Sequence, residues 1–168
     1  MSIHAIVVQM KKMLLNLDAC LEKATAHATA KKFEPQVLLQ SRLAPDMFPL
    51  MRQIQSACDQ AKYTAARTAG KDPPSHPDTE QTMDEARKRI ETVIAYLDGF
   101  TAKDFEGSDA RKITHPRWEG RSMTGLAYVL ENTQPNFYFH VTMAYAILRH
   151  NGVEIGKRDY LGKLTFAS

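Results

Sequence analysis

Apolar residues recur every three or four positions along four long stretches of the chain. In the first stretch these positions are Ile3, Ile6, Val7, Met10, Met13, Leu14, Leu17, Cys20, Leu21 and Ala24. This spacing puts them on one face of an α-helix that we expect to run from Ile3 to about Ala30. Ser2 can cap its start, and the sequence Phe33-Glu34-Pro35 ends it.

Two further helices are predicted in the middle of the chain. Asp46 can act as an N-cap and Pro49 is tolerated in a first turn, so we expect the second helix to run from near Met47 to Gly70. Residues 71–77, rich in proline and polar side chains, form an exposed loop. The third helix then begins near residues 78–79 and ends at Gly99, with residues 82–85 (Thr-x-x-Glu) as a second candidate capping box.

The periodicity changes between Phe105 and Tyr128, where short β-branched segments predict a small hairpin. Its strands would be Lys112–His115 and Arg121–Leu126. The last helix is expected from about Gln134, with Pro135 near its first position, to the Asn151-Gly152 stop. We expect residues 153–168 to pack as a loop over one end of the bundle.

Four amphipathic helices with a hairpin before the last predict an all-α four-helix bundle. The connections are longer than a simple up-and-down bundle needs, so at least one crossover connection is expected. The whole chain, residues 1–168, fits a single domain of this kind.

Composition and charge narrow the classes of function. The formal net charge is +3, and the basic residues are spread among acidic ones, which argues against nucleic-acid binding. Apolar runs such as Ile6–Val8 are too short to cross a membrane, so we expect a cytoplasmic protein with no membrane partner. Cys20 and Cys58 lie in helical patterns, where they read as small buried hydrophobes in a reducing compartment.

The candidate chemistry lies in residues 135–152, PNFYFHVTMAYAILRHNG. Asn136 and His140 are four residues apart, so they project from the same face of the last helix. Such a pair could be half of a metal site, or a hydrogen-bonded pair in the core. A zinc or nickel site needs about three protein ligands, and asparagine is a poor ligand for these metals compared with imidazole.

Three blocks of the sequence resemble the DinB/YfiT-like superfamily, in a branch classed as a domain of unknown function. They are residues 42–47 (RLAPDM), 135–140 (PNFYFH) and 156–162 (GKRDYLG). In the last helix of that superfamily a metal-binding histidine is followed nine residues later by arginine and twelve later by glycine. His140, Arg149 and Gly152 match this pattern.

The resemblance implies a four-helix bundle, often dimeric, whose better-known members bind a divalent metal through three histidines. It implies that His140 keeps one ligand position and that Asn136 replaces a second. Gln53 of the second helix is the position that best matches the third. With two histidines replaced by amides, we expect the metal site to be lost.

Three hypotheses for function follow. The first is a homodimer that binds or acts on a small polar molecule in a central pocket lined by Gln53, Asn136 and His140, where His140 could exchange a proton near neutral pH. The second is a hydrolase or thiol-dependent transferase that holds Zn²⁺ or Ni²⁺ on His140. The third is a non-catalytic dimeric module for structure or partner binding.

The predicted hairpin supplies weaker candidates. His115, Trp118 and Glu119 could form a lid over the pocket, although a tryptophan between Pro116 and Gly120 is also a common turn anchor. His76, in the proline-rich loop, is expected to be solvated.

Overall fold

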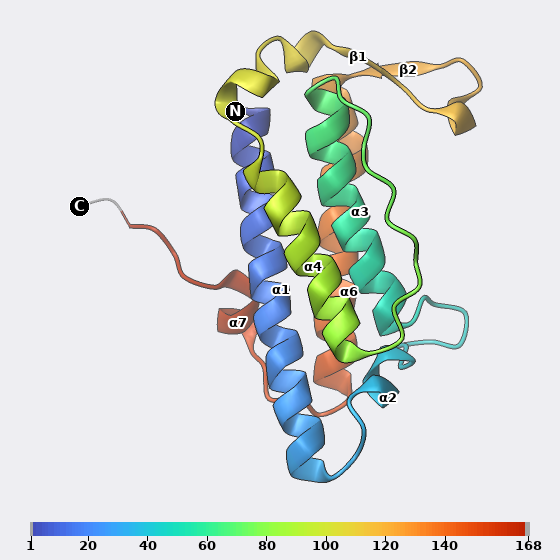
Figure 1. Ribbon diagram of the computed structural model, residues 1–168, viewed down its shortest axis with the longest axis vertical. Helices are drawn as coiled ribbons and strands as arrows, with labels where there is room; N and C mark the ends of the chain where they lie inside the picture. The colour runs from blue at the N-terminus through green and yellow to red at the C-terminus, as the bar shows by residue number, and fades with distance from the viewer. Residues whose placement is uncertain (1, 167–168) are drawn as a thin grey trace.

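The four long helices lie side by side in the computed structural model, which describes residues 2–166 (Figure 1). They are α1 (Ile3–Lys31), α3 (Leu50–Thr68), α4 (Met83–Asp98) and α6 (Gln134–His150). α1 and α6 run in one direction and α3 and α4 in the other, so residues 69–82 return along the bundle to join α3 to α4. The prediction of a four-helix bundle with a crossover is confirmed.

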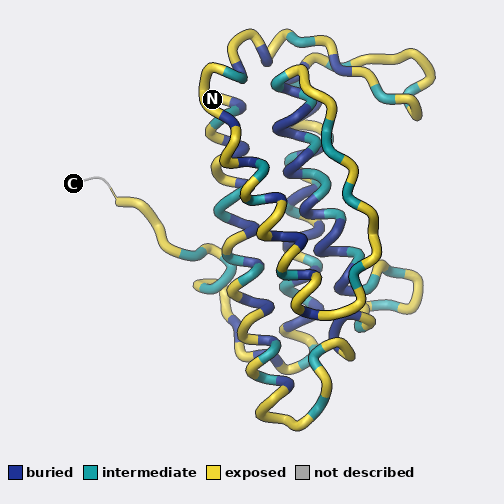
Figure 2. Tube along the Cα trace, viewed as in Figure 1, coloured by how far each residue is buried: buried dark blue, intermediate teal, exposed yellow. Residues whose placement is uncertain are grey.

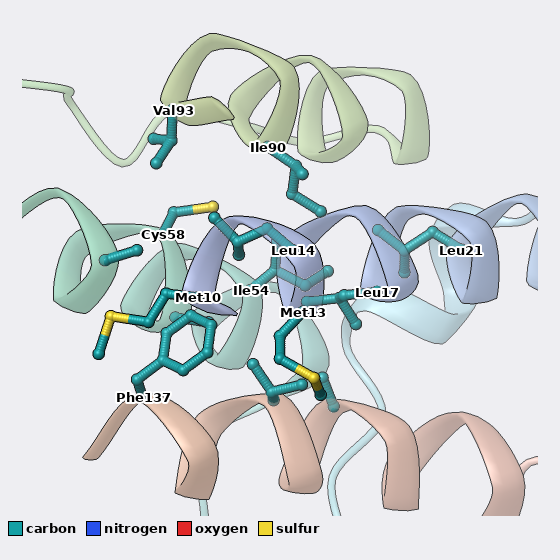
Figure 3. Close-up of a cluster of buried hydrophobic side chains, with 14 of the residues drawn as sticks. Met10, Met13, Leu14, Leu17, Leu21, Ile54, Cys58, Ile90, Val93 and Phe137 are labelled. Atoms are coloured by element: carbon teal, nitrogen blue, oxygen red, sulfur yellow. The ribbon is translucent and has the colours of Figure 1, made fainter. Parts of the chain in front are cut away.

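The apolar faces of these helices form one continuous core (Figure 2). Met10 and Leu14 of α1 lie between Ile90 of α4 and Phe137 of α6 in Figure 3, with Cys58 of α3 close by. Both cysteines are free and buried, and burial raises the pKa of Cys58 to about 12. Within residues 2–166, no helix is both long and apolar enough to span a lipid bilayer.

Two helix starts differ from the prediction. α3 begins at Leu50, and Asp46 does not cap it, because Pro49 is extended at the N-cap position (φ −70°, ψ 166°). Proline disfavours the α conformation in the residue before it, so Phe48 does not lie in the first turn of α3. α4 begins at Met83 rather than near residue 78. Its cap is the capping box offered by Thr82, whose hydroxyl accepts the backbone N–H of residue 85.

The hairpin is present between the third and last long helices. Strand β1 (Lys112–Thr114) pairs antiparallel with β2 (Ser122–Thr124), and the 3₁₀ turn η3 (Pro116–Trp118) lies in the loop between them. β2 is shorter than expected because the hydroxyl of Thr124 accepts the N–H of Ala127 and starts a helix at once.

Helical backbone leads into α6 without a break. α5 (Gly125–Ala127) continues into a π-helix, η4 (Tyr128–Thr133), and then into α6. Pro135 therefore lies inside a helical rod rather than at a free N-terminus. Proline lacks an N–H and its ring clashes with the carbonyl of the residue four positions earlier, and the wider π turn upstream relieves both constraints.

The remaining segments are short. They are α2 (Gln36–Leu39), the 3₁₀ turns η1 (Ala102–Phe105) and η2 (Ser108–Ala110), and α7 (Lys157–Leu161). The tail was expected to cover one end of the bundle, and this is wrong: α7 packs along the side of α1. Asp159 accepts the N–H of Gly156 at 2.8 Å and pairs with Lys23, and Asn16 donates to the Tyr160 carbonyl at 2.9 Å. These contacts fix a short helix on the flank of α1.

Candidate binding site between helices α3 and α6

The structure brings together two of the three predicted site residues. Gln53, near the start of α3, and His140, in the middle of α6, meet where these two helices pack against each other. Oε1 of Gln53 lies 2.7 Å from Nδ1 of His140. Gln53 is fully buried, whereas His140 keeps 8% of its surface exposed. The contact therefore lies just beneath the surface.

The hydrogen-bond partners of Gln53 fix the state of the imidazole. Nε2 of Gln53 donates to the Phe48 carbonyl at 3.2 Å, which turns Oε1 toward His140. The carbonyl of Phe48 precedes the first turn of α3, and Nε2 of Gln53 is its hydrogen-bond donor. Oε1 can only accept, so Nδ1 of His140 carries the proton and Nε2 carries the lone pair.

Burial keeps this imidazole neutral. Burial and, to a lesser extent, the positive charge of Arg52 together lower the pKa of His140 to about 4. At neutral pH the ring is a hydrogen-bond acceptor or a ligand through Nε2. The prediction that it exchanges a proton near neutral pH is not supported by this environment.

Asn136 lies one turn before His140 on α6 and is half-buried. Within residues 2–166 its side-chain amide forms no hydrogen bond, so it can bind water or a ligand. The ring of Phe139 meets that of His140 edge to face, with centroids 5.3 Å apart. Phe48 is about half exposed, and the guanidinium of Arg52 lies 5.8 Å from its ring centroid. The hydrogen-bonding groups of Asn136 and His140 thus have aromatic rings and a guanidinium group as neighbours.

The donors at this site do not suit zinc or nickel. Only His140 offers a strong nitrogen ligand, and the amide oxygen of Gln53 already accepts the histidine proton. In the part of the chain that the structure describes, no group of three or more His, Cys, Asp or Glu side chains is arranged to hold a metal ion. The chemistry of the donors therefore argues against the divalent-metal hypothesis.

Five surface hollows with volumes of about 10 to 470 Å³ are lined by other residues. None of these five hollows is lined by Gln53, Asn136 or His140. Gln53 and His140 form a hydrogen-bonded pair with one edge of the imidazole near solvent and the unbonded amide of Asn136 one turn away.

Comparison with known protein families assigns the chain to one of them. The family DUF1993, described as a domain of unknown function, matches residues 3–161. The chain belongs to the DUF1993 family. It is also similar to a DinB family member protein from Shewanella denitrificans known from a crystal structure. The two share 50% sequence identity and a TM-score of 0.93, over 96% of this chain and 92% of that one. A search among curated proteins found no significant match.

Sequence reasoning missed a second polar contact in this DUF1993 protein, which we call the α3–α4 charge cluster. It consists of Asp59, Lys62, Asp78, Glu80 and Arg89. Arg89 donates to Glu80 at 2.9 Å and to Asp59 at 3.0 Å, and Lys62 donates to Asp59 at 2.8 Å. The side chains of Lys62 and Arg89 are only 2% and 3% exposed. One feature of the sequence could have located Lys62 and Arg89: each places a charge within a stripe of apolar helix positions.

The weaker candidates lie elsewhere in this DUF1993 protein. His76 is not simply solvated: its Nδ1 lies 3.5 Å from Nζ of Lys62. His115 and Trp118 pack at the hairpin end, where Trp118 meets Tyr128 and Tyr128 meets Arg67. Arg67 follows Gln53 by fourteen residues on α3, a distance of about 21 Å at 1.5 Å per residue. The hairpin is therefore not a lid over His140.

Proposed function

We propose that this protein binds a small polar molecule at the surface formed by Asn136 and His140, with Gln53 orienting the imidazole from below. The observation that carries the proposal is the 2.7 Å hydrogen bond between Nδ1 of His140 and Oε1 of Gln53. It leaves the lone pair of Nε2 without a partner inside this pair. A ligand would donate a hydrogen bond to Nε2 and exchange one with the amide of Asn136.

The surroundings favour a ligand that is polar on one side and apolar on the other. Phe48 and Phe139 are each about half exposed and flank the pair, and Arg52 adds a positive charge. A ligand with an amide or hydroxyl donor and a short carbon skeleton fits these groups. The charge of Arg52 does not call for an anionic ligand, because this guanidinium is already paired with Asp78.

Binding fits this site better than acid–base catalysis. A general base works best when its pKa lies near the operating pH. With a pKa of about 4, His140 is a weak base at neutral pH, but it remains a good hydrogen-bond acceptor.

The test is a ¹⁵N NMR titration of the histidine side chains with acetamide, glycolamide and glycerol. We expect at least one probe to shift the Nε2 resonance of His140 in a saturable way. His140→Gln assigns this resonance, and the response should be kept in His150→Gln, which changes an exposed histidine on the same helix. If no probe moves that resonance, the pair is a structural contact only.

A metal arm of the same experiment tests the second hypothesis. Nδ1 bonded to an amide oxygen is an arrangement that metal-binding histidines also use, since it leaves Nε2 free for the metal. An increase in melting temperature with Zn²⁺ or Ni²⁺ that disappears in His140→Gln would favour a metal-dependent hydrolase or transferase. We expect no such dependence, because the other donors are neutral amides.

The homodimer and the cytoplasmic location stay predictions. Sedimentation at several protein concentrations checks the first, with a dimer expected throughout the range. A monomer at every concentration would contradict it and would also remove the hypothesis of a dimeric structural module.

A further inference from the structure

A hollow of about 250 Å³ lies at the hairpin end of the bundle. Its walls come from the last turns of α3, from the turn η3 and from the π-helix η4. Arg67 on its wall is about 21 Å along α3 from Gln53, so the hollow is separate from the site at His140. Segments far apart in the sequence thus form one concave surface.

The charge of this hollow is positive. Arg67 and Arg117 line it, and no carboxylate does. Across residues 2–166, neither arginine forms an ion pair with an acidic side chain, in contrast to Arg87 and Arg89 of α4. Two arginines without a counter-charge on one concave surface favour the binding of an anion.

Arg67 is held in place by its neighbours. Its guanidinium lies 4.6 Å from the centroid of the Tyr63 ring, and its Nη1 donates to the hydroxyl of the buried Tyr128 at 3.0 Å. Stacking and this single hydrogen bond orient the planar group and leave other N–H donors for a ligand. An oriented guanidinium loses less entropy when it binds an anion than a free side chain does.

His115 adds a neutral donor to the same wall. Nδ1 of His115 accepts the backbone N–H of Arg117 at 3.1 Å, so in the neutral ring the proton is on Nε2. Burial lowers the pKa of His115, and the positive charges of Arg67 and Arg117 lower it further. Both effects favour the neutral ring, which keeps its one N–H donor on Nε2.

Aromatic side chains supply an apolar wall. The rings of Trp118 and Tyr128 meet edge to face with centroids 6.0 Å apart, and both line the hollow. Tyr128 and Asn132 both lie on the π-helix η4, a rare helix type that is often found at functional sites. The amide of Asn132 faces the same space and can exchange hydrogen bonds with a bound molecule.

We propose that this hollow binds a small aromatic anion. Its carboxylate or phosphate would pair with Arg67 and Arg117, and its ring would pack against Trp118 and Tyr128. The volume limits the ligand to about one ring, since pockets for drug-sized molecules begin at roughly 300 Å³.

Trp118 is the only tryptophan of the chain, so its fluorescence reports directly on this hollow. We would titrate the protein with benzoate, phenyl phosphate, inorganic phosphate and benzyl alcohol. A saturable fluorescence change is expected with benzoate or phenyl phosphate, and their comparison distinguishes a carboxylate from a phosphate ligand. Inorganic phosphate and benzyl alcohol should bind at least several-fold more weakly, because the first lacks the aromatic ring and the second lacks the negative charge.

Variants then assign the response to the two arginines. Arg67→Gln should weaken binding about tenfold, the cost of losing one charged hydrogen bond. The exposed Arg158→Gln, which makes the same change of net charge on α7, should have no effect. Circular dichroism checks that Arg67→Gln folds, and Arg117→Gln, an exposed position, gives the same test if it does not.

Four results would overturn the proposal. They are the absence of saturation by either aromatic anion up to about 10 mM, equal binding of benzyl alcohol, equal binding of inorganic phosphate, and binding that survives both arginine substitutions. None of these depends on His140, so the site between α3 and α6 can fail or succeed independently.

Discussion

Helix α3 makes a buried polar contact with each of two neighbours, and the two contacts differ in charge. Toward α6, Gln53 and His140 form one neutral hydrogen bond. Toward α4, Asp59 and Lys62 join Arg89 in the α3–α4 charge cluster, which also holds residues 78–80 of the crossover segment. The first contact leaves a ring nitrogen available, whereas the second uses its charges on one another.

This difference makes the contact between Gln53 and His140 a candidate binding surface and the α3–α4 charge cluster a purely structural contact. A buried charge loses several kcal/mol of hydration, which only near-complete pairing offsets. In the cluster both terminal nitrogens of Arg89 pair with carboxylates, and among the described residues only its buried Nε has no partner, so the cluster holds the crossover segment against α3 and α4. A neutral imidazole loses much less, so His140 can be buried with one nitrogen left for a ligand. The predictions below test this contrast, from the largest expected effect to the smallest.

Removal of Arg89 should cost the most. Arg89→Leu leaves Asp59 and Glu80 without their main partner, and we expect a loss of about 3 to 5 kcal/mol in the free energy of unfolding. Urea denaturation measures it. The control is Arg87→Leu on the same helix, whose pair with Asp18 is partly exposed and should be worth less than about 1 kcal/mol. Equal losses in the two variants would show that the buried ion pairs of Arg89 stabilise the fold no more than the partly exposed pair of Arg87.

Acid should weaken the neutral contact. Because the pKa of His140 is about 4 when folded and about 6.5 when unfolded, the unfolded chain binds more protons between these values. Stability from the neutral ring is therefore complete above about pH 6.5 and is lost as the pH falls toward 4, by roughly 2 to 3 kcal/mol. Urea denaturation at both ends of this window, compared with His140→Gln, isolates the histidine from titrating carboxylates. The same pH dependence in both proteins would refute the prediction that His140 causes this loss of stability.

Removal of Gln53 should have an intermediate effect. Gln53→Leu leaves the Phe48 carbonyl and the Nδ1 proton of His140 without partners, for which we expect a loss of about 1 to 3 kcal/mol. Gln55→Leu, two residues further along α3 and bonded to Glu80 in the cluster, is the matched comparison. A fully neutral effect of Gln53→Leu would mean that the buried hydrogen bond is not formed.

The smallest effect is expected at the edge of the cluster. Asp78 is about one third exposed and contacts Arg52 and Arg89. Asp78→Asn should cost about 0.2 to 1 kcal/mol, since water screens this pair. A loss as large as that of Arg89→Leu would show that the cluster works as one unit rather than as a buried centre with a weak rim.

The sequence predicted the bundle because its apolar stripes repeat with the helical period. Leu14, Leu17 and Leu21 of the first predicted helix are all in the core, as their positions on its stripe require. Local chemistry also located the Thr82 capping box and the hairpin. It failed at Met47 and Asp46, where the effect of Pro49 on Phe48 outweighs a favourable cap residue.

The polar contacts were harder to predict, for a reason that Lys62 illustrates. Its position on α3 predicts burial, but its partners lie on another turn and in the crossover segment, and no local pattern shows that they meet. Gln53 was located only through the family resemblance, which matched it to the third ligand position of the superfamily but left the register of α3 open. The resemblance could not supply the tautomer of His140, which depends on the Phe48 carbonyl.

The central claim is that His140 is neutral at physiological pH, with its proton on Nδ1 and a free lone pair on Nε2. The most direct test is a ¹⁵N NMR titration of the His140 ring in the wild-type protein between about pH 3 and about pH 8, a range that spans its folded and unfolded pKa values. We expect a pKa of about 4 and Nδ1–H throughout the neutral range. A pKa at or above the ordinary histidine value, or a proton on Nε2 at neutral pH, would contradict the account.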